Sequence, residues 1–290
     1  MVPMRKDKTS GEGPPSKVDK AASGSAQKSL YREAGCGAVA LYDDEATRLH
    51  AVYFGRMPEP RKETLTHQTR AEMEFTMEVC PGLRRAFICD GAEVNWRNAH
   101  STEQYLAQKA FDLGQTCPET FYIVDFFHAC EHLKSAADAL YGEKSAKGAL
   151  FFQDRKYWLQ NFDGGVNQLI ESLRYHMGRA KGQTKAKLRE EINYFTNQSK
   201  RMDYAHYSRL NLPIGSGVVE AACKMLLTTR MKRSGMQWSQ HGGQGMLTLR
   251  AWVKSNRFDT AFQDLIPPTQ FEALAVMQRD PTHQLLRLVA

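Results

Sequence analysis

Arg85-Ala86-Phe87-Ile88-Cys89-Asp90-Gly91 is a short apolar run that ends in an aspartate and a glycine. A run of this length with a turn dipeptide behind it is typical of a buried strand. Phe121-Tyr122-Ile123-Val124 repeats the pattern and ends in Asp125. The sequence therefore predicts two buried strands, each with an aspartate at its carboxyl end, which is where α/β folds commonly place ligands.

The segment between these strands has helical spacing. Ser101 with Gln104 three residues later matches a capping box, and Leu106, Ala110 and Leu113 continue at four- and three-residue intervals. We therefore expect a helix that begins at Ser101 and connects the two strands.

Further strands are expected before this unit and further helices after it. Residues 37–42 and 49–54 read as a hairpin around the polar turn 43–45, and residues 61–78 are expected to be helical. Later in the chain, apolar residues recur at helical intervals: Val166, Leu169, Ile170, Leu173, Met177, Leu188, Ile192 and Phe195. Strands early and helices late predict a mixed α/β fold that contains an α-helical insertion.

The composition is that of a globular chain with a basic bias. The 290 residues carry a net charge of +7, which favours polyanionic partners. The six cysteines form no CxxC pair, so we expect reduced thiols rather than a disulfide framework. There is no apolar run of the ~20 residues that a membrane span needs, and no signal-peptide core, so we expect a cytoplasmic protein.

Pro213-Ile214-Gly215-Ser216-Gly217-Val218-Val219-Glu220 predicts a break followed by a helix with a carboxylate in its first turns. Residues 201–260 hold nine Lys and Arg against three Asp and Glu, a balance of 9 − 3 = +6. The cations closest to Glu220 could hold phosphates: Lys224, Arg230, Lys232 and Arg233. The helix dipole alone also favours a carboxylate at Glu220, and a solvated basic face also explains the cations.

Asp90 and Asp125 each have a structural alternative as well. Asp-Gly is an ordinary turn dipeptide, and an aspartate after a strand can simply begin the next turn or helix. The same neighbourhood offers a different metal motif, because His128-Ala129-Cys130-Glu131-His132 matches the H-x-x-E-H pattern of one group of zinc peptidases. That pattern is short, and no third zinc ligand is evident downstream.

Several of these segments together resemble the DDE transposases of bacterial insertion sequences, specifically the ISKra-type group related to Mutator-like elements. The matching segments occur in order over residues 31 to about 260: Tyr31-Arg32-Glu33-Ala34-Gly35, Cys89-Asp90-Gly91-Ala92, Val124-Asp125-Phe126-Phe127-His128-Ala129, Gly215-Ser216-Gly217-Val218-Val219-Glu220 and Arg230-Met231-Lys232-Arg233-Ser234-Gly235-Met236-Gln237-Trp238.

The resemblance implies a ribonuclease H-like mixed sheet core interrupted by the helical insertion. Asp90 would be the second carboxylate of the catalytic triad and Glu220 the third, both binding Mg²⁺ or Mn²⁺, with two ions expected in the intact site. Asp125 and His128 would form the family's Asp/Cys-x-x-His signature, supporting the site from outside the triad. The DNA-binding residues would be Lys224, Arg230, Lys232, Arg233 and Trp238.

With these roles, we expect five segments along the chain, of which the first is a disordered loop or remnant and the last is a tail. The boundaries are 1–30 for the remnant, 31–135 for the α/β half of the core, 136–212 for the insertion, 213–265 for the catalytic helix and basic C-terminal part, and 266–290 for the tail. The partners implied are DNA, as terminal inverted repeats and as target, and further copies of the chain in a synaptic complex.

One departure from the family pattern bears on activity. In the family the first aspartate precedes a Met-Val-Pro-Met-like stretch, and here that stretch is residues 1–4. We therefore expect a truncated reading frame whose first strand is largely missing, which binds DNA weakly and catalyses nothing. The alternatives are a catalytically dead DNA-binding remnant and the zinc peptidase with His128, Glu131 and His132.

Overall fold

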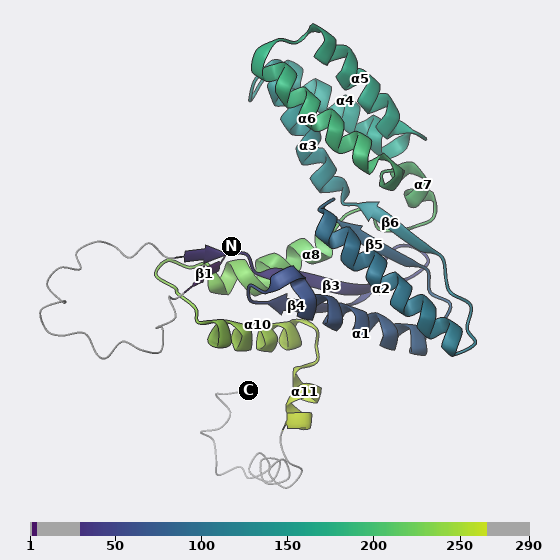
Figure 1. Ribbon diagram of the computed structural model, residues 1–290, viewed down its shortest axis with the longest axis vertical. Helices are drawn as coiled ribbons and strands as arrows, with labels where there is room; N and C mark the ends of the chain where they lie inside the picture. Colours follow the sequence, from purple (N-terminus) through teal and green to yellow (C-terminus); the bar gives the residue numbers. More distant parts are fainter. Residues whose placement is uncertain (1, 5–29, 266–290) are drawn as a thin grey trace, which may run out of the picture. The chain divides into compact units, whose positions relative to one another are not determined.

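The computed structural model describes residues 2–4 and 30–265 (Figure 1). The predictions of a disordered segment over 5–29 and of a tail over 266–290 lie outside the described residues. We expected residues 1–30 to be a disordered loop or remnant. For residues 2–4 this prediction was wrong, because Val2–Met4 forms strand β1. It pairs antiparallel with β2 (Leu30–Arg32), in the register Val2 to Arg32. Val2 and Met4 are buried, and this burial stabilises the strand. The sequence did not predict it, because polar residues follow these two apolar side chains.

The chain forms two compact units. The first comprises the described parts of residues 1–38, 51–65 and 222–265, and the second comprises residues 39–50 and 66–221. The hairpin of β3 (Gly35–Tyr42) and β4 (Arg48–Arg56) contributes strand residues to both units. Its turn is held by Asp43, whose carboxylate accepts the backbone N–H groups of Glu45 at 3.0 Å and Thr47 at 2.7 Å.

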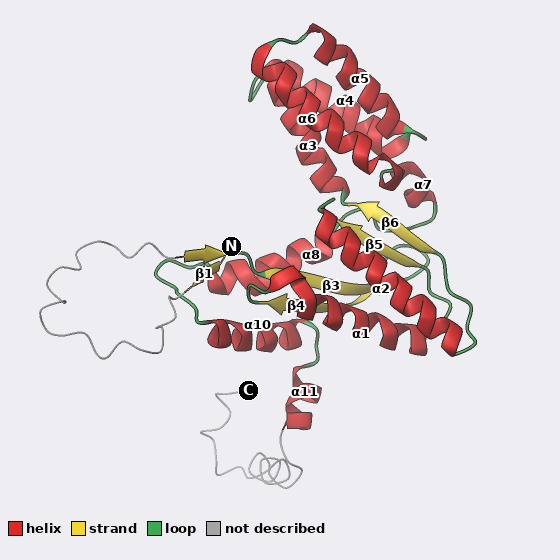
Figure 2. Ribbon diagram, in the orientation of Figure 1, coloured by secondary structure: helices red, strands yellow, loops and turns green. Residues whose placement is uncertain are grey.

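A β-α-β unit lies within the second compact unit. Strands β5 (Arg85–Cys89) and β6 (Thr120–Val124) pair in parallel, with Cys89 opposite Val124 (Figure 2). Parallel neighbours need a crossover, which α2 (Glu93–Asp112) supplies. Both predicted strands are present, but only β6 has fully buried residues, and every residue of β5 is half-buried.

The expected start of α2 was wrong. The helix begins at Glu93 with Ala92 as its N-cap residue, and Ser101 lies inside it. The Ser101 hydroxyl accepts a hydrogen bond from the Arg70 guanidinium at 3.0 Å instead of capping a helix. A capping box is a signal carried by a few neighbouring residues. Here the end of the strand decides where the helix begins, because β5 ends at Cys89, the chain turns at Asp90 and Gly91, and α2 follows.

Helices make up most of the rest of the second unit. They are α1 (Glu63–Val79, from residue 66 on), α3 (Phe126–Tyr141), α4 (Ala146–Asn161), α5 (Gly165–Arg179), α6 (Gly182–Gln198), η2 (Ser199–Arg201), α7 (Tyr204–Arg209) and α8 (Gly217–Ala222, to residue 221). The apolar stripe predicted over 166–195 is buried except for the half-buried Met177, and α3 to α6 pack on one another (Figure 1). Because α3 begins at Phe126, the expected boundary at 135/136 falls inside a helix.

The first unit contains the ends of the hairpin strands that lie away from the turn, residues 35–38 of β3 and 51–56 of β4. Its helical segments are η1 (Pro60–Lys62), the π-helical turn η3 (Cys223–Thr228), α9 (Thr229–Met231), α10 (Gln240–Lys254) and α11 (Phe258–Leu265). Strand β4 is fixed to α10, because Ser255 accepts the Tyr53 N–H at 2.9 Å and Gln244 both accepts the Met57 N–H and donates to the Gly55 carbonyl.

Candidate carboxylate site at the ends of β5 and β6

Asp125 lies at the carboxyl end of β6 and is buried, with 5% of its surface exposed. Its backbone N–H donates to the Cys89 carbonyl at 2.8 Å, which extends the β5–β6 ladder by one residue. One carboxylate oxygen caps α3 by accepting the Phe127 N–H at 2.9 Å, and the other accepts the Ser216 hydroxyl. Both oxygens are therefore engaged, so Asp125 organises the site from within.

Asp90 occupies the equivalent position after β5 and is exposed. Its Oδ1 accepts the Ala92 N–H at 3.0 Å and the Asn95 side-chain amide at 2.8 Å, which closes the turn into α2. Gly91 makes this turn at φ = +94°, a conformation that side chains rarely adopt. Since Oδ1 carries both hydrogen bonds, Oδ2 is the oxygen that Asp90 could offer to a ligand.

The loop that precedes α8, the helix that carries Glu220, is bonded to the same end of the strand pair. The Phe126 N–H donates to the Ile214 carbonyl at 2.9 Å, and the Ser216 hydroxyl binds Asp125. A side chain at Gly215 would meet the Phe127 ring at 2.7 Å, so only glycine allows this approach. The Glu220 N–H donates to the Ser216 carbonyl at 3.0 Å, which places Glu220 one helical turn beyond the Asp125 contact.

The histidines of the H-x-x-E-H segment lie on α3 with their rings 5.1 Å apart. His128 Nδ1 is 3.1 Å from Glu131, whereas His132 Nδ1 is 2.6 Å from Glu191 of α6. Glu191 is almost completely buried and also contacts Lys187 at 3.0 Å. Burial opposes the charged form of Glu191, but the hydrogen bonds from His132, Lys187 and Ser135 outweigh it and lower the pKa of the carboxyl.

Tyr194 of α6 contacts both His132 and the turn that follows Asp90. Its ring stacks on His132 at 3.5 Å, and a side chain at Gly91 would meet it at 3.4 Å. Its hydroxyl is buried and has no hydrogen-bond partner among the described residues. Burial raises the pKa of Tyr194, and the charges of Asp90 and Asp125 raise it further, so the hydroxyl stays protonated as a donor.

Sequence patterns singled out Asp90, Asp125, His128 and Glu220 but not Tyr194, Glu191 or the role of Ser216. Glu191 left one signal, because it lies between Leu188 and Ile192 on the apolar stripe of α6, where a carboxylate needs a buried partner. Tyr194 left no comparable signal, since its contacts come from α3 and from the turn after β5.

The carboxylate oxygens of Asp90 and Glu220 are the type of ligand atom that a hard cation prefers. Asp90 Oδ2 and the exposed Glu220 carboxylate accept no hydrogen bond from the described residues, and Mg²⁺ prefers carboxylate oxygens. Within residues 2–4 and 30–265, no group of three or more His, Cys, Asp or Glu side chains is arranged to hold a metal ion. Asp90 and Glu220 thus each have a carboxylate oxygen without a hydrogen bond from the described residues, whereas both oxygens of Asp125 are bonded within the protein.

The expected DNA-binding residues belong to the first compact unit. Lys224, Arg230, Lys232 and Arg233 are exposed, and Arg233 Nε donates to the Thr229 carbonyl at 3.0 Å. Trp238 is half-buried, and its indole N–H donates to the Met231 carbonyl at 3.2 Å. The indole of Trp238 is therefore part of the local fold, while the four cations face solvent.

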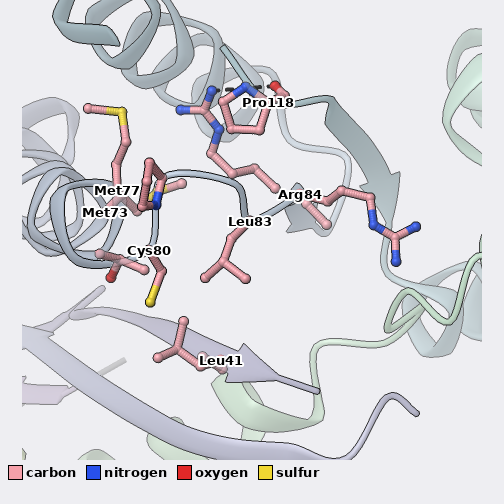
Figure 3. Close-up of a pocket in the computed structure, with 12 residues that line it drawn as sticks. Leu41, Met73, Met77, Cys80, Leu83, Arg84 and Pro118 are labelled. Carbon is pink, nitrogen blue, oxygen red and sulfur yellow. Dashed lines mark hydrogen bonds between the residues drawn. The ribbon is translucent and has the colours of Figure 1, made fainter. Parts of the chain in front are cut away.

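The second unit also contains a pocket whose lining includes none of the predicted site residues. It is bounded by Leu41 of β3, by Met73 and Met77 of α1, and by the segment that leads into β5 (Figure 3). Arg85 donates to the Pro118 carbonyl at its edge. The lining is mostly apolar and contains no carboxylate, so we assign it no part in the site.

No protein-family model, curated protein or solved structure matches this chain. None of the helices in the described part of the chain has the length and apolar character needed to cross a membrane.

Proposed function

We propose that this chain is the catalytic region of a DDE-type transposase, with a ribonuclease H-like core and Asp90 and Glu220 as two of its metal-binding carboxylates. The observation that carries the proposal is the convergence on Asp125. The end of β5, the start of α3 and the loop before α8 all bond to this residue or its neighbours. Asp90 directly follows β5, and Glu220 lies one helical turn beyond Ser216, which supports a shared role for the two carboxylates.

The order of elements also supports the proposal. A β-α-β unit is followed by helices α3 to α7, and the chain then returns to the strand ends at Ser216. This is the arrangement expected of a core interrupted by a helical insertion. Ligands of parallel sheets bind outside the carboxyl ends of the strands, where Asp90 lies.

Each protein group has a distinct role in this proposal. Mg²⁺ or Mn²⁺ bound there would activate a hydroxyl nucleophile and stabilise the leaving oxygen at phosphorus. Asp90 Oδ2 and Glu220 would hold the cation, and Asp125 would fix the loop before α8. His128, half-exposed on α3, would donate a hydrogen bond to a phosphate. Lys224, Arg230, Lys232 and Arg233 would neutralise the DNA backbone without reading its sequence.

Mn²⁺ binding tests the site without requiring turnover. Electron paramagnetic resonance of the full chain should show an Mn²⁺ site whose affinity falls about tenfold or more in Asp90→Asn and in Glu220→Gln. Glu93→Gln is the matched control, because Glu93 is also exposed at the start of α2 and should leave the affinity unchanged. Equal Mn²⁺ affinity in the wild type and both site variants would remove the basis of the proposal.

The proposal assigns no residue of this chain to the first aspartate of the triad. Asp43 is committed to the hairpin turn through its bonds to Glu45 and Thr47. We therefore expect cation and DNA binding without strand transfer by residues 1–290. Mg²⁺-dependent strand transfer by the purified chain would contradict this assignment and would require a further carboxylate.

A further inference from the structure

His128 and His132 lie one turn apart on α3, which packs against α6 within the second compact unit (Figure 1). Residues four apart share one face of a helix, and the centres of the two imidazole rings are 5.1 Å apart. The side chains of His128 and His132 are 34% and 26% exposed, so solvent reaches both. The pair is therefore an accessible cluster of ring nitrogens, and the proposed function uses only His128.

A carboxylate holds the Nδ1 atom of each histidine. His128 Nδ1 is 3.1 Å from Glu131, and His132 Nδ1 is 2.6 Å from the buried Glu191. When the Nδ1–H of a neutral imidazole donates to a carboxylate, its Nε2 keeps a free lone pair. Neither Nε2 atom has a hydrogen-bond partner among the described residues. Histidines that bind metal ions are commonly held by carboxylates in this way.

Helix α6 fixes the direction of the His132 ring from a second side. Tyr194 stacks on this ring with the ring centres 3.5 Å apart and an angle of 14° between the planes. Glu191 and Tyr194 are three residues apart on α6, so both reach α3 from one face. Glu191 is itself held by Lys187 at 3.0 Å. The ring of His132 is thus oriented before a ligand binds, which lowers the entropy cost of binding.

The distance between the two rings suits one zinc ion. Zn–N bonds of about 2.1 Å at a tetrahedral ion place two imidazole centres roughly 5 Å apart. The rings of His128 and His132 have this separation. Imidazole nitrogen suits Zn²⁺, whereas Mg²⁺ prefers oxygen ligands. Among the described residues, no third His, Cys, Asp or Glu side chain joins the pair in a metal-holding arrangement, so these residues supply two ligands.

We propose that His128 and His132 form a two-histidine Zn²⁺ site, with the Nε2 atom of each ring as a ligand and water in the remaining positions. Glu131 and Glu191 orient the two rings through Nδ1. This site differs from a zinc-peptidase centre, because Glu131 is bonded to His128 instead of being free to act as a base. Zn²⁺ on His128 Nε2 also excludes a hydrogen bond from that atom to a phosphate. The zinc site itself does not depend on the proposed function.

The Zn²⁺ affinity of the full chain, measured by competition with a chromophoric chelator, tests the pair. His128→Gln and His132→Gln should each lower the affinity about tenfold or more, because one imidazole alone cannot chelate the ion. Glu191→Gln should lower it about tenfold, since the carboxylate orients the ring and makes it a stronger ligand. His67→Gln is the matched control, because His67 is an exposed histidine on α1, and it should leave the affinity unchanged. Circular dichroism checks that each variant is folded.

X-ray absorption of the wild-type chain with one equivalent of Zn²⁺ gives a readout that needs no variant. We expect nitrogen and oxygen neighbours at about 2.0–2.1 Å and no sulfur at about 2.3 Å. A sulfur neighbour would overturn the proposal, because cysteines would then bind the ion. Wild-type Zn²⁺ affinity in both histidine variants would overturn it as well. Neither measurement involves Asp90 or Glu220, so a failure of the zinc site is distinguishable from a failure of the proposed function.

Discussion

The hydroxyl groups of Tyr194 and Tyr204 differ in whether they have a hydrogen-bond partner among the described residues. The Tyr204 hydroxyl donates to the Val124 carbonyl at 2.9 Å, whereas the buried Tyr194 hydroxyl has no partner among the described residues. A buried polar group without a partner costs about 1–3 kcal/mol, and one with a partner stabilises the fold by about 1 kcal/mol. Such a group at a carboxylate site is typical of a residue kept for function at the expense of stability.

Replacing each tyrosine by phenylalanine should therefore change stability in opposite directions. Tyr194→Phe should raise the free energy of unfolding by about 1 kcal/mol, because it removes an unpaired hydroxyl. Tyr204→Phe should lower it by about 1–2 kcal/mol, because the Val124 carbonyl loses its donor. Urea unfolding of the two variants measures both values. A loss of similar size in both variants would show that the Tyr194 hydroxyl has a partner in solution.

Glu191 makes the stability of the fold depend on pH. Its pKa is lowered in the folded chain, because the bonds from His132, Lys187 and Ser135 outweigh burial. A carboxyl with a lowered folded pKa contributes stability above the ordinary glutamate pKa of about 4.3. That contribution is lost as the pH falls from there through the folded pKa.

The variant Glu191→Gln should flatten the acid limb of the stability profile. Between about pH 5 and pH 3, the wild type should lose more unfolding free energy than the variant does. Glu190→Gln is the control, because Glu190 also contacts Lys187 at 3.0 Å but is exposed, and it should keep the wild-type slope. Parallel profiles for the wild type and Glu191→Gln, from urea unfolding at each pH, would contradict the assignment.

At the scale of elements, the junction of α4 and α5 shows how close helix packing selects residues. A side chain at Gly165, the first residue of α5, would lie 2.1 Å from the Trp158 carbonyl oxygen. At Gly178, near the other end of the same helix, a side chain would meet nothing within 4 Å. The two glycines therefore serve different purposes within one helix.

Alanine at these two positions should separate packing from helix propensity. Gly165→Ala should cost about 3 kcal/mol or more, because the backbone of α4 must move away. Gly178→Ala should stabilise the chain by about 0.5 kcal/mol, because alanine has less backbone entropy to lose in a helix. Thermal unfolding followed by circular dichroism compares them. A neutral Gly165→Ala variant would show that the junction is looser than described.

At the scale of the whole molecule, the net charge of +7 favours polyanions, but total charge does not say where they bind. Matched substitutions can locate the contact. One variant changes Lys224, Arg230, Lys232 and Arg233 to Gln, and the other changes the exposed Arg174, Lys181, Lys185 and Arg189 to Gln. Both variants have the same net charge.

The first variant should change the salt dependence of DNA binding, and the second should not. Each phosphate contact adds about 0.9 to the slope of log affinity against log salt concentration. Gel-shift titrations at several salt concentrations should therefore give a slope about 3–4 smaller for the first variant. Equal slopes in the two variants would mean that only net charge matters and that the cluster is a solvated face.

The sequence by itself determined the strands 85–89 and 120–124, the hairpin, and the apolar stripe of α5 and α6. These follow from hydrophobic periodicity, which acts within one element. It also marked Asp90, Asp125 and Glu220, because each lies where an element begins or ends. Only the tertiary structure decided the start of α2, the burial of Val2 and Met4, and the contacts among Ser216, Asp125, His132, Glu191 and Tyr194. Those contacts join residues far apart in the chain, and hydrogen bonds between distant polar groups leave no periodic trace in the sequence.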